Sequence, residues 1–132
     1  MGAGAIPVHI DKIFRERVAG IHKLKIYTAD FGYEGGGAIN VSFQNGHYTL
    51  TPPKALLLDY RLGRKKEKAF EKEYFEFLKE SFIQYRFVWD NMLDSDRIVL
   101  VCKCNIDDKT CHRHFLIKFL KKFGAASKGK LK

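Results

Sequence analysis

The sequence of 132 residues contains no apolar run that approaches the roughly 18 residues a membrane-spanning helix needs. Its N-terminus lacks the cationic start and continuous apolar segment of a secretion signal. Only three cysteines and three prolines occur, so neither a disulfide scaffold nor a proline-rich chain is indicated. These absences predict a soluble cytoplasmic protein with reduced thiols and no membrane partner.

Several familiar phosphate-binding motifs are also missing. No Walker loop is present, and the glycines of Gly35–Gly37 lack the spacing of a dinucleotide fingerprint. A tyrosine-phosphatase loop is excluded because Ile117, not arginine, stands six positions after Cys111. No cofactor is therefore predicted, and the sequence leaves open whether the protein is an enzyme.

The composition predicts one globular domain with an aromatic core. The chain is 45% hydrophobic and has 11 Phe and 6 Tyr, enough apolar surface to fold without a metal or disulfide. We expect a leader and short amphipathic helix over residues 1–22, one α/β domain over 23–124 and a basic flexible tail over 125–132. The net charge of +9 favours a nucleotide or nucleic-acid partner, although a solvated lysine surface explains it equally simply.

Hydrophobic periodicity predicts strands alternating with helices. A continuous apolar run before Cys102 is typical of a central strand buried on both faces. The aromatic stretch from Tyr85 to Trp89 is predicted as helix or ordered loop; core packing is its favoured role and a homodimer face the alternative. This order predicts a small three-layer α/β domain with a mostly parallel sheet. The expected strands are Leu24–Ala29, Ala38–Phe43 and Ile98–Cys102, and the expected helices are Ile10–Val18, residues 51–62, Glu67–Phe82, Ile83–Leu93 and Cys111–Phe123.

The most informative segment is the crowded group of cysteines near the C-terminus. Cys111 lies where the last helix is expected to begin, and unpaired N–H groups there stabilise a thiolate. His112 falls on the buried face of that helix, and Arg113 is placed to pair with a phosphate or carboxylate. These three residues are the candidate catalytic group.

Three interpretations of this segment remain open. In the first, Cys111, His112 and Arg113 form a pocket for an anionic substrate. In the second, Cys102, Cys104 and Cys111 bind a metal such as zinc together with His112 or the outward-facing His114, although the spacing differs from the usual paired knuckles. In the third, the cysteines are small buried hydrophobes.

Parallel sheets bind ligands beyond the carboxyl ends of their strands. The facing wall of the predicted pocket should therefore come from the end of the first strand. We expect Tyr27, Thr28 and Asp30 to bind the ligand there, together with Cys102 from the central strand.

Several of these segments together resemble domain-of-unknown-function family 488. They are Ile26-Tyr27-Thr28, the helical region containing Asp59-Tyr60-Arg61, the strand ending in Cys102, and Cys111-His112-Arg113-His114. The resemblance covers about residues 25–124 and implies a Rossmann-like domain with a site at Cys102, Cys111, His112 and Arg113. It also implies an enzyme or binding domain acting on nucleotides or nucleic acids. The chain departs from the family pattern at Cys104, commonly acidic, and at Asn40-Val41-Ser42, where larger members often have Asp-Val-Arg.

Overall fold

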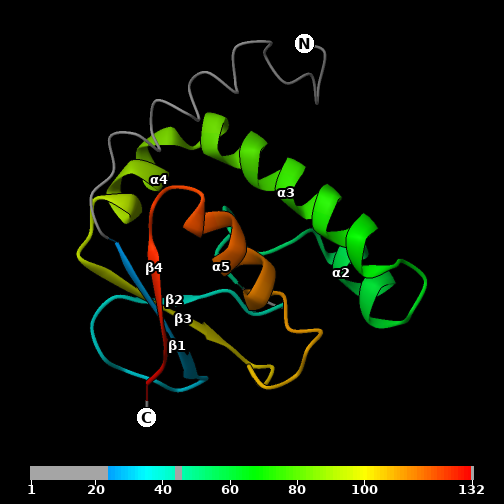
Figure 1. Cartoon of the computed structure of the whole chain (residues 1–132), viewed down its shortest axis with the longest axis horizontal. Helices are drawn as coiled ribbons and strands as arrows, with labels where there is room; N and C mark the ends of the chain where they lie inside the picture. Colours follow the sequence, from blue (N-terminus) through cyan, green and yellow to red (C-terminus); the bar gives the residue numbers. More distant parts are fainter. Residues whose placement is uncertain (1–23, 44–45, 132) are drawn as a thin grey trace.

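The computed structural model describes residues 24–43 and 46–131. Within these residues the chain forms an α/β fold in which four helices accompany one four-stranded sheet (Figure 1). The strands are β1 (Lys25–Asp30), β2 (Ala38–Asn40), β3 (Arg97–Cys102) and β4 (Ala126–Lys130), and the helices are α2 (Lys54–Arg61), α3 (Glu67–Gln84), α4 (Arg86–Leu93) and α5 (Arg113–Lys121).

The sheet is entirely parallel, with strand order β2-β3-β1-β4. β3 lies between β2 and β1, and its side chains from Ile98 to Cys102 are all buried, as the continuous apolar run predicts. Asp30 of β1 pairs in register with Cys102 of β3, so the carboxyl ends of the two strands lie side by side. This architecture confirms the predicted small Rossmann-like α/β class.

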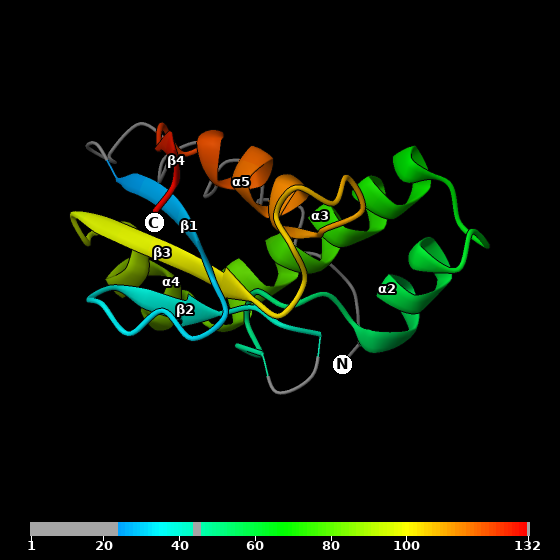
Figure 2. The ribbon, with the colours of Figure 1, turned by 90° about the horizontal axis from the view of Figure 1, so that it is seen from below.

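The main core lies between the sheet and the helices. Ile98 and Leu100 of β3 pack in one cluster with buried residues of α2, α3, α4 and α5. In Figure 2, α5 runs over the sheet and α3 lies behind α5. A smaller cluster of Ala29, Val99 and Val101 lies on the opposite face. The helical periodicity seen in the sequence therefore corresponds to faces buried on the sheet.

The structure departs from the expected elements in several places, and α2 and α4 each begin three residues later than expected, at Lys54 and Arg86. Residues 126–130, expected to belong to a flexible tail, form the edge strand β4. Its backbone pairs with β1, although most of its side chains are exposed. The second strand is shorter than expected, because the chain leaves the sheet after Asn40. α5 begins at Arg113, two residues later than expected. The expected helix Ile10–Val18 lies outside the described residues.

The aromatic stretch after α3 is helical. Trp89 of α4 is fully buried and donates its indole N–H to Ser81 Oγ at 2.9 Å, whereas Phe87 is 79% exposed. Core packing therefore accounts for Trp89. In the part of the chain described here, no helix is long and apolar enough to cross a membrane.

Candidate functional site

The candidate site lies where β3 ends and α5 begins. Between them runs the cysteine loop, residues 103–112, which is fixed by its own hydrogen bonds. Asp108 accepts bonds from the Thr110 N–H at 2.9 Å and the Thr110 hydroxyl at 2.8 Å. His114 on the first turn of α5 bonds back to the Ile106 carbonyl at 2.8 Å. The loop is thereby folded back toward the end of β3, which brings its cysteines together.

Three sulfurs and one imidazole meet in this fold. Cys104 Sγ lies 2.9 Å from Cys102 Sγ and 2.8 Å from Cys111 Sγ. With His112, they form a group whose donor atoms all lie within 4.8 Å of one another; we call these four residues the cysteine–histidine cluster. All three thiols are free. Cys102, Cys111 and His112 are buried, and Cys104 is partly exposed.

His112 is held in a defined orientation. Its Nε2–H donates to the carbonyl oxygen of Val41, in the segment that follows β2, at 2.5 Å. Its other ring nitrogen, Nδ1, is buried and has no hydrogen-bond partner among the residues that the structure describes. Burial lowers the pKa of His112 to about 4. The ring is therefore neutral at pH 7, with its proton on Nε2 and a lone pair on Nδ1.

Arg113 is a buried cross-link. Its Nη1 donates to the carbonyls of Ala29 and Leu100 at 2.9 and 3.1 Å, and its Nη2 to the carbonyl of Cys104 at 2.8 Å. Its Nε donates to Cys111 Sγ at 3.3 Å. The guanidinium thus ties together the ends of β1 and β3, the cysteine loop and the cluster, while its positive charge lies beside the sulfurs.

The hydrogen bonds among the sulfurs distinguish Cys104 from its neighbours. Bonds with Cys102 and Cys111, followed by an interaction with Arg61, lower the pKa of the Cys104 thiol. The bond to Cys104 is the main cause that raises the pKa of Cys102. For Cys111 the contact with Cys102 lowers the pKa, but the bond to Cys104 and burial prevail and raise it. A single thiolate is therefore best placed on Cys104.

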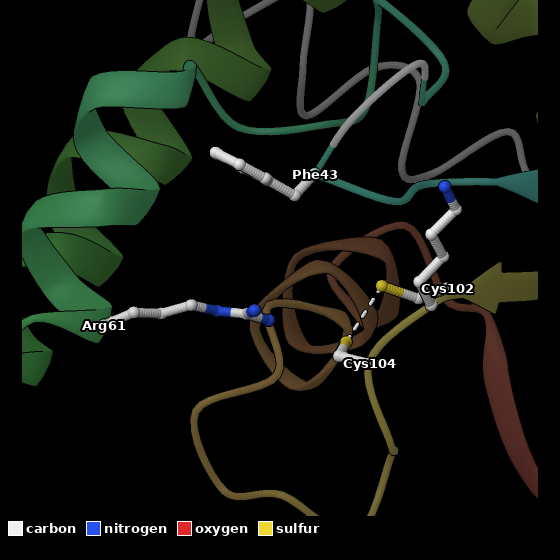
Figure 3. Close-up of a pocket in the computed structure, with 5 residues that line it drawn as sticks. Phe43, Arg61, Cys102 and Cys104 are labelled. Carbon is white, nitrogen blue, oxygen red and sulfur yellow. Dashed lines mark hydrogen bonds between the residues drawn. The ribbon is translucent and has the colours of Figure 1, made fainter.

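A pocket of about 250 Å³ opens beside the cluster. It is lined by Phe43, Arg61, Cys102, Lys103 and Cys104. Figure 3 shows the Arg61 side chain reaching from the end of α2 toward the two sulfurs, with the Phe43 ring on another side of the opening. The pocket brings two cationic side chains to the most exposed sulfur of the cluster.

The predicted site residues divide into three groups. Cys102 lines the pocket, whereas Cys111, His112 and Arg113 are fully buried behind it. Tyr27, Thr28 and Asp30 do not line it. Tyr27 lies under the guanidinium of Arg97, Thr28 is buried in the sheet, and Asp30 forms an ion pair with Lys130 at 3.2 Å.

Three residues of the pocket are not among the predicted site residues: Phe43, Arg61 and Lys103. The sequence contains one indication that Arg61 belongs to the site, because Arg61 ends the Asp59-Tyr60-Arg61 segment that resembles the family. Lys103 stands between two site cysteines but looks like an ordinary loop lysine. Phe43 continues the apolar–polar alternation of the expected strand Ala38–Phe43. The sequence pattern therefore predicts a buried strand residue and not a residue that lines a pocket.

A parallel α/β sheet with a cysteine–histidine cluster beyond its central strand defines a Rossmann-like domain with a thiol-rich site. The sequence matches the family model DUF488-N3a, described as the active DUF488-N3 subclade, over residues 23–124. The chain therefore belongs to the DUF488 family, as the resemblance implies. No curated protein and no solved structure matches it.

Proposed function

We propose that the protein binds a phosphate-bearing ligand, such as a nucleotide, in the pocket beside the cysteine–histidine cluster. The observation that carries this proposal is that Arg61 and Lys103 line one pocket with the partly exposed Cys104. The five lining residues described for this pocket include no aspartate or glutamate, and the two cations outnumber the single thiolate placed on Cys104. The net positive charge of such a surface attracts an anion.

Each lining residue has a distinct part in binding. The planar guanidinium of Arg61 can hold two phosphate oxygens at once, and the ammonium of Lys103 adds a second positive charge. The ring of Phe43 offers an apolar face for the remainder of the ligand. A volume of about 250 Å³ is small for a whole nucleotide, so the phosphate lies inside and the nucleoside extends outward.

The Cys-His-Arg turn supports this pocket from behind. Cys111 and Arg113 act as positioning residues because they hold Cys104 through its sulfur and its carbonyl, and His112 fixes the turn to the Val41 carbonyl. The description of the matched family as active agrees with a catalytic role, and Cys104 is the cluster sulfur that a ligand would meet first. The free thiols suit the reducing cytoplasm in which we place the protein.

Titration calorimetry with inorganic pyrophosphate and ADP tests this function. We expect Arg61→Ala to weaken binding about 10–100-fold, because charge-assisted hydrogen bonds contribute about 1.5–3 kcal/mol. Arg64→Ala is the matched control, since Arg64 is also exposed but pairs with Asp59 at 3.0 Å. Equal affinity in wild type and Arg61→Ala, or equal loss in both variants, would overturn the proposal.

A second candidate function is nucleic-acid binding by the outer face of α5. A hollow of about 420 Å³ there is lined by His114, Ile117, Lys118, Lys121 and Lys122. These lysines, with exposed Lys128 and Lys130 of the adjoining β4, form what we call the α5–β4 basic surface. It is separate from the phosphate pocket, and its own test depends on ionic strength.

A further inference from the structure

We infer that the cysteine–histidine cluster binds a single thiophilic divalent cation, for which zinc is the expected ion. Cys102, Cys104, Cys111 and His112 supply three sulfurs and one imidazole within 4.8 Å of one another. Cys₃His is an established ligand set for tetrahedral zinc. Because these atoms are so close together, they suit one ion and not a polynuclear iron–sulfur cluster, whose ligands are divided among several irons.

The buried imidazole is the second, independent observation. His112 is fully buried, and its Nε2–H is bound to the Val41 carbonyl. Within residues 24–43 and 46–131, its Nδ1 has no hydrogen-bond partner. A buried acceptor without a partner costs free energy, so it needs an explanation. Metal-bound histidines commonly bind the ion through one nitrogen and donate the other N–H to a carbonyl or carboxylate. In His112, Nδ1 is available to bind an ion, and the Nε2–H already donates to the Val41 carbonyl.

The charge around the cluster also suits an ion. Each hydrogen bond described for Arg113 ends on a carbonyl oxygen or on Cys111 Sγ. Burying a guanidinium is costly, and compensating negative charge nearby offsets that cost. A zinc ion with three thiolates and one neutral imidazole has a net charge of −1, so the ion, its ligands and Arg113 would together be neutral.

Small movements would admit the ion. Sulfurs bound to one tetrahedral zinc at about 2.3 Å lie about 3.8 Å apart, whereas the close pairs here are 2.8 and 2.9 Å apart. Cys104 therefore has to move by about 1 Å from its neighbours. It lies in the cysteine loop and is partly exposed, so it is the ligand best able to move.

This inference does not rest on the phosphate pocket. A fourfold-coordinated ion leaves Arg61 and Lys103 outside its coordination sphere, so an anion can still bind beside them. In the metal-loaded protein Cys104 would be a metal ligand, and only in the metal-free protein would it react as a free thiol. Alkylation of Cys104 therefore distinguishes the metal-free protein from the metal-loaded protein.

The test combines elemental analysis with cobalt titration. We expect about one zinc per chain after expression with added zinc, and tetrahedral thiolate–cobalt absorption when Co²⁺ is added to the metal-free protein. Cys104→Ser should weaken Co²⁺ binding by more than about 100-fold, beyond the 10–100-fold typical of an outer-shell change. Bound zinc should also protect Cys104 from iodoacetamide. His114→Gln is the control, because it removes a nearby imidazole outside the cluster but keeps a side-chain N–H that can donate to the Ile106 carbonyl, so this variant should keep full metal binding.

The outcomes are distinct from those for the phosphate pocket. Arg61→Ala should lose pyrophosphate binding and keep its zinc, whereas Cys104→Ser should lose zinc. Far-ultraviolet circular dichroism establishes that each variant is folded, and His112→Gln provides a second ligand variant if Cys104→Ser is not. Zinc far below one per chain together with no thiolate–cobalt band in wild type would overturn the inference. Equal cobalt affinity in wild type and both ligand variants would do the same.

Discussion

At the scale of single residues, the sequence identifies Arg113 as a site residue, but the burial of its side chain decides what it does. A Cys-His-Arg turn suggests an arginine that holds a ligand anion. In the fold this guanidinium is fully buried and bonds to three carbonyls and one sulfur. The exposed arginine of the pocket is Arg61 instead, which comes from α2.

We therefore predict that Arg113→Met lowers the free energy of unfolding by about 3–5 kcal/mol, as for other broken buried charge networks. The substitution leaves three carbonyl groups without their donor and removes the charge beside the sulfurs. Urea denaturation monitored by circular dichroism measures the effect. Arg64→Met serves as the control, because Arg64 is exposed and its loss should change stability by less than about 0.5 kcal/mol. A loss below about 1 kcal/mol in Arg113→Met would contradict a cross-linking role.

At the scale of elements, the turn before β2 depends on a glycine. Gly37 has φ of 80°, and a Cβ added there would lie 3.1 Å from the Arg97 carbonyl oxygen of β3. Its own carbonyl accepts a hydrogen bond from the Val99 N–H at 2.8 Å. The close approach of this turn to β3 is therefore possible because residue 37 has no side chain.

Gly37→Ala should accordingly destabilise the protein by about 1–2 kcal/mol, from the left-handed backbone and the crowding together. The neighbouring Gly36→Ala is a suitable control, because a Cβ there meets nothing within 4 Å and its φ lies outside the left-handed region. Chemical denaturation of the two variants in parallel provides the comparison. If Gly36→Ala proved as harmful as Gly37→Ala, the conformational explanation would be wrong.

The elements that could be predicted from the sequence are those whose pattern of apolar and polar side chains follows their burial. β3 is a continuous apolar run, and α3 has apolar residues at helical spacing, so both follow from pattern alone. β4 does not, because Ala126–Lys130 is an edge strand with mostly exposed side chains that is held by its backbone. An exposed edge has no apolar periodicity to detect.

The same distinction applies to the site. The four residues of the cysteine–histidine cluster lie within eleven positions of the sequence, so their proximity could be proposed from spacing. Arg61 is more than forty positions earlier, and its place in the pocket depends on how α2 packs near the cysteine loop. No local sequence pattern predicts how α2 packs near the cysteine loop.

At the scale of the whole molecule, the positive charge is divided between two surfaces with different expected ligands. The phosphate pocket has two cations around a small, partly open space, which suits one phosphate group. The α5–β4 basic surface is broad and exposed, and some of its charge is already engaged: Lys118 pairs with Glu71 at 2.8 Å and Lys130 with Asp30 at 3.2 Å. Exposed lysines spread over a surface favour a polymer of phosphates.

The dependence of binding on salt separates these two surfaces. We predict that the protein binds a mixed-sequence DNA duplex with an affinity that falls as salt rises, because each phosphate contact releases counterions. Replacing Lys121 and Lys122 together by alanine should reduce the slope of log K against log salt by about 1.8 if each contacts one phosphate. Fluorescence anisotropy over a salt series measures the slope. Arg61→Ala should leave the slope unchanged, so a loss of DNA binding in Arg61→Ala with no change in the lysine variant would place the polymer in the phosphate pocket and refute binding on α5 and β4.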